Sequence, residues 1–239
     1  WRKGRLKNIR LILPNIEFRI SQPNREGDFI NIHVIFSDYI PPEKIKEFLS
    51  RLPLVSSDQD SRDLHCTPDD LGTIGYDKAL VELKRLRENL EGEFVPVRDY
   101  LIIGVARGHG SLRPGSAGGR GEELAIEIDK FSDAFYGSEE DTGFYLGTSR
   151  YPDAQPKPVI SGSDAHDLES LGSRWTWIKA DPTFEGLKQI TFEPEDRAKI
   201  KETKPDEKRS YFVLDKVRFI DNTGETNFPS DYIELNPGL

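Results

Sequence analysis

The chain has 239 residues, of which 31% are charged and 36% hydrophobic, and its formal net charge is −9. These values are typical of a folded globular protein, and the acidic balance argues against a simple nucleic-acid coat protein. No apolar run approaches the roughly 20 residues that a membrane span needs. The basic start Trp1-Arg-Lys-Gly-Arg has no apolar stretch behind it, so it is not a signal peptide.

Cys66 is the single cysteine of the chain, so no internal disulfide can form. This favours a reducing, cytoplasmic location, and it rules out a zinc site built on a Cys-x-x-Cys pair. Any metal site therefore needs histidine and carboxylate ligands. The sequence contains no methionine, so Trp1 is not an initiator residue and we expect the chain to be a fragment of a longer protein.

Apolar runs alternate with amphipathic stretches in the first part of the chain, as in α/β proteins. Leu11–Ile20 and Phe29–Phe36 are predicted strands, and Pro42–Leu52 is a predicted helix with proline at its start. The clearest predicted helix is Tyr76–Leu90, because its leucines recur on one stripe and Gly92 follows as a stop.

The middle of the chain continues the pattern. Tyr100–Val105 is a continuous apolar run, typical of a strand buried on both faces. Glu122–Phe131 is a predicted helix, Ala134–Tyr136 and Pro158–Ser163 are predicted strands, and a helix capped by Asp181 is expected to run to about residue 190. The order strand, helix, strand predicts parallel βα units, in a barrel or a doubly wound sheet.

The composition changes near residue 194. Residues 194–209 are almost wholly polar and read as a linker or an exposed edge. Tyr211–Ile220 and Asp231–Leu235 are predicted strands, with a turn at Asn222-Thr-Gly between them. We therefore expect one domain at 1–197, a linker at 198–209 and the start of a second domain at 210–239.

Asp164 and His166 follow the predicted strand Pro158–Ser163. In extended backbone, residues i and i+2 point to the same side, about 6–7 Å apart. A carboxylate and an imidazole that aim at one point are a good ligand pair for zinc, manganese or iron. The plainer alternative is a capping Asp164 and a surface His166, since Asp-x-His is short and common.

Three further positions complete the candidate set. His109 lies between two glycines just after the strand Tyr100–Val105, where the backbone can turn sharply; an incidental loop histidine is the alternative. The glycine-rich stretch that follows lacks the GxxxxGK[ST] spacing of a phosphate loop. His33 sits within an apolar strand, where a satisfied core histidine is the commoner case. Glu17 lies in an apolar setting, where an acidic side chain usually has a partner; an outward-facing strand residue is the alternative. His65 reads as a surface residue.

The order of these residues resembles the polymerase and histidinol phosphatase (PHP) family of metal-dependent phosphoesterases. Glu17 in Pro14-Asn-Ile-Glu matches the Glu-bearing element of the family, and its strand-borne histidines match His33 and His109. The final Asp-x-His element matches Asp164 and His166. The resemblance implies a distorted (β/α)7 barrel that binds as many as three zinc, manganese or iron ions at its C-terminal strand ends and hydrolyses phosphate esters. These five residues would be metal ligands.

Within that family the chain is most similar to the tRNA-ligase-like (TrlF-type) group, in which a PHP domain precedes an AAA/SMC-like ATPase. The stretches 128–134 and 163–197 carry this likeness, and Asn236-Pro-Gly-Leu resembles the lead-in to a Walker A loop. The likeness implies a partial PHP domain at 1–197, with an incomplete barrel, and an ATPase domain that starts at 210–239 and is cut before its phosphate loop. It also implies an ATPase partner in cis and favours nucleic acid among the phosphate-ester substrates.

Two features depart from the family pattern. Its opening His-x-His is absent after Trp1-Arg-Lys, and Asn15 replaces a glycine of the Glu-bearing turn. Two functions therefore stay open: a metal-dependent phosphoesterase, including a nuclease, or a catalytically inactive scaffold that regulates or docks an ATPase. A third interpretation is a plain α/β domain in which the histidines and acids lie far apart.

Overall fold

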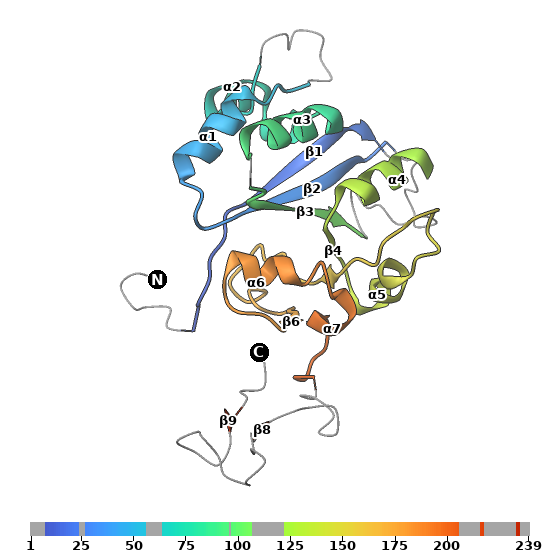
Figure 1. The fold of residues 1–239 in the computed structure, drawn as a ribbon. Helices are drawn as coiled ribbons and strands as arrows, with labels where there is room; N and C mark the ends of the chain where they lie inside the picture. The colour runs from blue at the N-terminus through green and yellow to red at the C-terminus, as the bar shows by residue number, and fades with distance from the viewer. Residues whose placement is uncertain are drawn as a thin grey trace, which may run out of the picture. The chain divides into compact units, whose positions relative to one another are not determined.

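The computed structural model describes residues 8–23, 27–55, 64–95, 97–106, 122–205, 216–217 and 233–234. The chain divides into two compact units, Trp1–Ile200 and Lys201–Leu239. The first unit is mixed α/β, as the sequence predicts, and its centre is a five-stranded sheet in the order β1-β2-β3-β4-β5 (Figure 1). Whether this sheet belongs to a PHP-type barrel stays a prediction.

The strands of this sheet run in two directions. β1 pairs with β2, and β2 with β3, in antiparallel fashion, whereas β3, β4 and β5 are parallel. The strands are β1 Asn15–Pro23, β2 Phe29–Phe36, β3 Tyr100–Val105, β4 Ala134–Tyr136 and β5 Val159–Ile160. The prediction of parallel βα units is therefore confirmed from β3 onward and wrong before it. A short connection forces β2 to run back along β1, and β3 begins beside the end of β2, where Tyr100 lies opposite Phe36.

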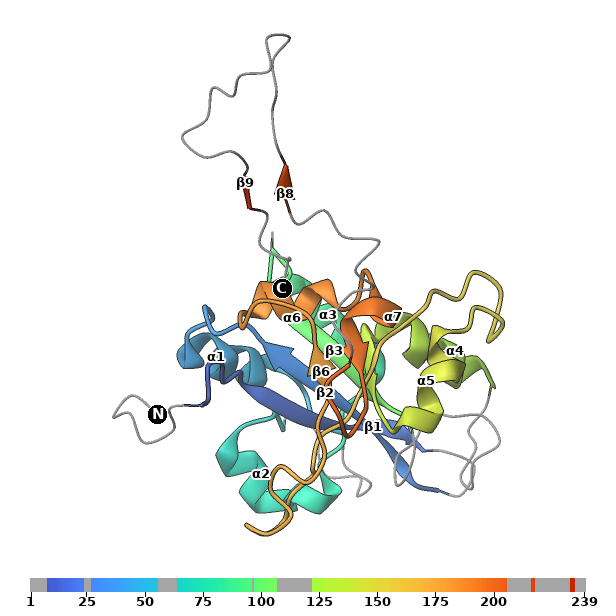
Figure 2. The same cartoon turned by 90° about the horizontal axis from the view of Figure 1, so that it is seen from below.

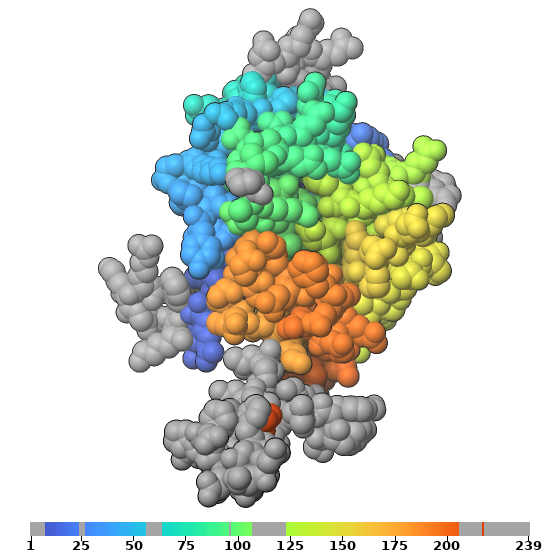
Figure 3. All heavy atoms as spheres, in the orientation of Figure 1, coloured from blue at the N-terminus to red at the C-terminus, as the bar shows by residue number. Residues whose placement is uncertain are grey.

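Seven α-helices lie within the described part of the first unit. Their bounds are α1 Pro42–Arg51, α2 Pro68–Ile74, α3 Leu83–Glu93, α4 Glu122–Phe131, α5 Glu139–Leu146, α6 Phe184–Gln189 and α7 Pro194–Arg197. α1 and α3 cover one face of the sheet, and α6 lies on the other face (Figures 1 and 2). In the space-filling view the orange atoms of α6 and α7 lie against the rest of the unit (Figure 3).

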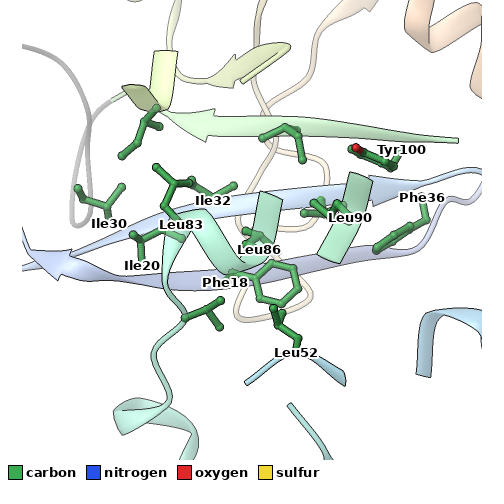
Figure 4. Close-up of a cluster of buried hydrophobic side chains, with 14 of the residues drawn as sticks. Phe18, Ile20, Ile30, Ile32, Phe36, Leu52, Leu83, Leu86, Leu90 and Tyr100 are labelled. Carbon is green, nitrogen blue, oxygen red and sulfur yellow. The ribbon is translucent and has the colours of Figure 1, made fainter. Parts of the chain in front are cut away.

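The larger hydrophobic core lies between the sheet and the helices α1 and α3 (Figure 4). Alternate residues of β2 point into it, because successive side chains of a strand face opposite sides. α3 contributes Leu83, Leu86 and Leu90, which are all buried. The second core lies on the opposite face and includes Ile103 of β3 and Phe184 of α6. Both faces of the sheet are thus covered, but the second only in part.

The segment Tyr76–Leu90 is not one helix, contrary to the prediction. A short 3-10 turn occupies Tyr76–Lys78, and α3 begins only at Leu83. Between them, the Leu80 carbonyl accepts a hydrogen bond from the Val55 amide, and Val81 exchanges two hydrogen bonds with β1. Strand-like pairing therefore satisfies the backbone of residues 80–81, and the spacing of Leu80 relative to α3 is a coincidence of the sequence.

Two later predictions also change. α6 starts at Phe184 and is capped by Thr183, whose side chain accepts a hydrogen bond from the Gly186 amide, so Asp181 is not the cap. Within 194–209, the first residues are structured. They form α7 and the strand β7 (Ala198–Lys199), which pairs antiparallel with β6 (Trp177–Ile178).

The described part of the second unit is small. β8 (Lys216–Val217) pairs antiparallel with β9 (Ile233–Glu234), within the two strands predicted for this region. The assignment of 198–209 as a linker and of 210–239 as the start of an ATPase domain stays a prediction. Among the residues that the structure describes, none of the helices has the length and hydropathy to cross a membrane.

Candidate metal site

His33 lies on the face of the sheet opposite the large core. Its neighbours Ile32 and Val34 are fully buried in that core, so the alternation of the strand turns His33 to the side of α6. The side chain is half-buried there. His33 is therefore not a residue of the main core, which was the alternative interpretation of its sequence context.

Glu17 is the direct cross-strand partner of His33, since β1 and β2 pair in that register. Directly opposite residues of an antiparallel pair share a face and have their Cβ atoms about 4.5–5.5 Å apart. Phe18 and Ile20 of β1 point into the large core, which leaves Glu17 on the other face, where it is exposed. The sheet thus places one carboxylate beside the imidazole.

Asn15 contacts the same imidazole ring. Its side-chain amide nitrogen lies 3.2 Å from Nδ1 of His33. An asparagine can present either its NH2 group or its carbonyl oxygen to one ring nitrogen, so this contact suits both neutral tautomers of His33. With the carbonyl oxygen accepting from Nδ1–H, the ring keeps Nε2 as a free acceptor, which is the form that binds a metal.

Tyr136, at the end of β4, also packs against this ring. The two ring centroids are 4.8 Å apart and the planes are nearly perpendicular, at 86°. Burial raises the pKa of the Tyr136 hydroxyl above its usual value of 10.0. The tyrosine is therefore a neutral side chain that packs edge to face with the imidazole and helps to fix its plane.

Asp164 approaches from the segment that follows β5. Its backbone has a φ of 45°, in the left-handed region that non-glycine residues seldom adopt. Its carboxylate and that of Glu17 both raise the pKa of His33, but burial outweighs them and leaves that pKa below the model-compound value of 6.5. The site therefore holds a neutral imidazole in the electrostatic field of two carboxylates.

The segment that carries Asp164 is closed by a side-chain clasp. Thr176 Oγ1 accepts a hydrogen bond of 2.6 Å from the Ser161 amide and donates one of 3.1 Å to the Ser161 carbonyl. Residues 162–175 thus form a loop whose two ends touch, as in the compact surface loops that often serve function. Within it, the Asp167 carboxylate accepts two hydrogen bonds from Ser170.

His166 and His109 are the remaining predicted ligands. His166 is exposed on the same loop, two residues beyond Asp164. His109 lies outside the described residues. His65, which reads as a surface residue, is half-buried beside the start of α2, where its backbone amide donates to Asp70. No group of three or more His, Cys, Asp or Glu side chains with metal-binding geometry occurs among the residues described.

Asn31 adds a polar side chain to the neighbourhood of His33. It stands two residues before His33 on the same face, and its Oδ1 atom is buried without a hydrogen-bond partner. Oxygen donors together with an imidazole suit a divalent cation such as manganese. Glu17, His33 and Asp164 are of the residue types that such a metal prefers, but they form no group with metal-binding geometry among the described residues.

Asn15, Asn31 and Tyr136 are the site residues that the sequence interpretation missed. Both asparagines stand two positions before a predicted ligand on the same strand, so the period of two places them on the ligand face. That spacing was the available signal. Tyr136 could not be found in this way, because its contact with His33 depends on the order of strands in the sheet.

A second polar cluster joins α4 to the segment that follows α5, and its side chains bind one another. Arg150 and Asp129 form a salt bridge of 2.8 Å, with side chains only 4% and 8% exposed. The Arg150 guanidinium also donates to the Tyr145 carbonyl at the end of α5, at 2.7 Å. The Tyr151 hydroxyl donates to Asp129, and desolvation together with this hydrogen bond raises the pKa of Tyr151 to about 12. Burial lowers the pKa of Lys157, which binds Asp129 as well.

Comparison with known proteins adds one match. Residues 149–189 match the protein family described as PHP-associated. No curated protein and no solved structure matches the chain. The matched segment is a minority of the chain, but it includes Arg150, β5, the loop with Asp164 and His166, and α6. The chain therefore carries a PHP-associated region, and this region supplies one side of the candidate metal site.

Proposed function

We propose that this chain carries a metal-dependent phosphoesterase site of the PHP type. The proposed ligands are Glu17, His33, His109, Asp164 and His166, and the cofactor is divalent manganese, zinc or iron. The observation that carries the proposal is the electrostatic setting of His33, a neutral imidazole influenced by the carboxylates of Glu17 and Asp164. The PHP-associated match supports it independently, because it contains Asp164 and His166.

A bound divalent cation would lower the pKa of a coordinated water and neutralise charge that develops on a phosphate ester. Residues of the chain set the protonation state and the direction of the proposed ligands. Burial keeps His33 uncharged near neutral pH, so no proton has to leave the ring before it binds a cation. Asn15 and Tyr136 fix the direction of the ring, and Glu17 and Asp164 supply the negative charge that attracts a cation.

The test is metal binding and hydrolysis by the purified chain. We expect bound manganese or zinc by elemental analysis and cleavage of bis(p-nitrophenyl) phosphate that a chelator abolishes and Mn²⁺ restores. His33→Gln and Asp164→Asn should each reduce metal content and rate by at least about tenfold, since each removes a proposed ligand. Loss of neither property in these variants would contradict the proposal.

Asp153 offers a matched control for Asp164. It is also an exposed aspartate with a left-handed φ, of 65°, and it lies in the same PHP-associated region. Asp153→Asn should leave metal content and hydrolysis unchanged. A folded wild-type chain with neither metal nor hydrolysis would instead favour the scaffold alternative.

The substrate class follows as a further part of the proposal. We infer a phosphate ester, with nucleic acid as the preferred member, from the resemblance to the TrlF-type group alone. Competition between a single-stranded oligonucleotide and bis(p-nitrophenyl) phosphate tests it, because an oligonucleotide substrate should inhibit cleavage of the aryl ester. An ATPase partner in cis belongs to the same proposal.

A further inference from the structure

A pocket of about 510 Å³ lies where residues of α3, the start of β3 and the end of α4 come together. This volume falls within the range of roughly 300–1,000 Å³ that is usual for small-molecule sites. Among its lining residues, Phe94 and Tyr100 belong to the large core, and Phe131 packs against that core. The pocket is therefore on the face of the sheet that α3 covers (Figure 1), opposite His33 and separate from the candidate metal site.

The charge of this pocket is opposite to that of the chain. The described residues that line it include three cations, Arg87, Arg98 and Lys130, and one carboxylate, Glu91. When Asp133 is also counted, because it pairs with Arg98, three cations against two carboxylates leave one positive charge. The whole chain has a formal net charge of −9. A positive pocket in an acidic protein attracts anions that the rest of the surface repels.

Arg87 is the cation best placed to bind such an anion. Its guanidinium lies 4.9 Å from the centroid of the Phe131 ring, so this contact links α3 to α4. The side chain is half-buried, and within the described part of the chain no carboxylate pairs with it. A guanidinium that a ring already holds in place loses little freedom on binding, and its planar N–H groups fit two oxygens of a phosphate.

Arg98 supplies the second guanidinium. It lies 4.9 Å from the centroid of the Tyr100 ring, and its Nη2 atom donates to Asp133 at 2.6 Å. The Ile102 amide of β3 donates to the same carboxylate oxygen, which fixes Asp133 and with it Arg98. Lys130 has its ammonium 5.6 Å from the centroid of the Tyr151 ring, outside the lining, so we assign it no direct contact with the anion.

We propose that this pocket binds a small phosphate monoester of the nucleoside monophosphate type, with its phosphate on Arg87 and Arg98. The doubly charged phosphate suits two guanidiniums. Val95, which is 65% exposed, and the partly buried ring of Phe131 give the lining an apolar surface against which a planar base can pack. The site needs no metal, so the inference goes beyond the proposed function and does not depend on it.

Calorimetric titration of the full chain with adenosine monophosphate (AMP), in EDTA to exclude divalent cations, tests the site. We expect a Kd below about 1 mM in the wild type. In Arg87→Gln it should be at least about tenfold weaker, because a charged hydrogen-bond donor is lost while glutamine suits a helix. Arg85→Gln is the control, since Arg85 is exposed on the same helix, pairs with Glu82 and Glu88 and does not line the pocket. It should bind AMP as the wild type does.

Glu91→Gln tests the sign of the electrostatic effect. The variant removes a carboxylate from the lining, so AMP should bind several-fold more tightly, a gain that a damaged fold cannot produce. Inorganic phosphate and adenosine, titrated separately into the wild type, should each bind at least about tenfold more weakly than AMP, because each offers only one of the two contacts.

Three results would overturn the inference: no binding of AMP, equal losses in Arg87→Gln and Arg85→Gln, or inorganic phosphate that binds as tightly as AMP. The last result would show that the organic group makes no contact. Since no metal is present in these titrations, they leave the phosphoesterase proposal untouched. A chain that binds Mn²⁺ but not AMP would lose this inference alone, and a chain that binds AMP but no metal would lose the proposed function alone.

Discussion

Glu17 and His33 face each other across the first two strands of the sheet, and the carboxylate raises the pKa of the imidazole. The effect is opposed by burial, which is the larger influence and keeps His33 below its usual pKa. The balance between the charge of Glu17 and the burial of the ring sets the charge of His33 near neutral pH. It can be measured without any metal.

The first prediction concerns this titration in the metal-free chain. We expect the pKa of His33, followed by NMR of its ring protons, to lie below 6.5, and to fall further in Glu17→Gln, because the variant removes the charge that raises it. Between the folded pKa and 6.5 the unfolded chain binds more protons than the folded chain, so the free energy of unfolding should decrease as the pH falls through this window. Above pH 6.5 this contribution should be constant.

Glu43→Gln provides the comparison, since Glu43 is an exposed carboxylate in the first turn of α1. It should not move the His33 resonance. His33→Gln should flatten the pH dependence of unfolding in the same window. A His33 pKa of 6.5 or higher, or one that Glu17→Gln leaves unchanged, would show that the cross-strand charge is not felt as described.

The second prediction concerns the buried ion pair of Arg150 and Asp129. Arg150→Met removes one of the two cations that pair with the buried Asp129 carboxylate, and it removes the hydrogen bond to the Tyr145 carbonyl. We expect a loss of about 3–5 kcal/mol in the free energy of unfolding, measured by urea denaturation. Arg174→Met, at an exposed position of the loop 162–175, should change it by less than about 0.5 kcal/mol.

The double variant Arg150→Met with Asp129→Leu tests the cause. Removing both charges should cost less than the sum of the two single losses, because each single loss includes the same Arg150–Asp129 pair. Lys157 loses its carboxylate partner in the double variant but keeps its hydrogen bonds to the backbone carbonyls of residues 129 and 132. If the two single losses in the free energy of unfolding simply add, the two side chains act independently, and the ion pair does not stabilise the fold as a pair.

The third prediction concerns the aromatic centre of the large core. Phe48 is fully buried, and its ring lies 5.6 Å from that of Phe94 and 6.0 Å from that of Phe36, measured between centroids. Phe48→Ala should destabilise the fold by about 3–5 kcal/mol, through lost burial and the cavity that remains. Phe192→Ala removes a ring that is 79% exposed and should have almost no effect on urea denaturation. Equal losses in the two variants would contradict this picture of the core.

The sequence predicts the local elements of this fold better than their arrangement. Glu122–Phe131 and Ala134–Tyr136 form with the bounds expected, because caps and apolar periodicity are local signals. The antiparallel pairing of β3 with β2 and the strand-like pairing of Leu80 are not determined by the local sequence. They depend on which backbone groups meet in space. Hydrophobic spacing carries no such information.

The same limit applies to the site. Histidine and carboxylate types identify His33 and Asp164 as candidates, and strand periodicity places Glu17 on a definite face. The sequence cannot show that Tyr136 would meet the imidazole, since the two residues are separated by a third strand, β3, in the order of the sheet. It also cannot show that the oxygen of Asn31 would be left without a partner, because that depends on packing.

The last prediction concerns the clasp between Thr176 and Ser161. Thr176→Val keeps the shape of the side chain but removes both hydrogen bonds to the Ser161 backbone, whose amide and carbonyl are then unsatisfied. The free energy of unfolding should fall by about 1–3 kcal/mol. Because the clasp closes the loop three residues before Asp164, we also expect Mn²⁺ to bind several-fold more weakly. Calorimetric titration and urea denaturation measure the two effects separately.

Thr176→Ser retains the hydroxyl and should restore both properties, which separates the hydrogen bonds from the methyl group. Phe48→Ala supplies the other comparison, since that variant weakens the fold through the large core rather than through the loop and should leave the Mn²⁺ affinity of the folded chain intact. A Thr176→Val protein that loses stability but binds Mn²⁺ as the wild type does would limit the clasp to folding. A combined loss would instead tie the closure of this loop to the position of Asp164, as the geometry requires.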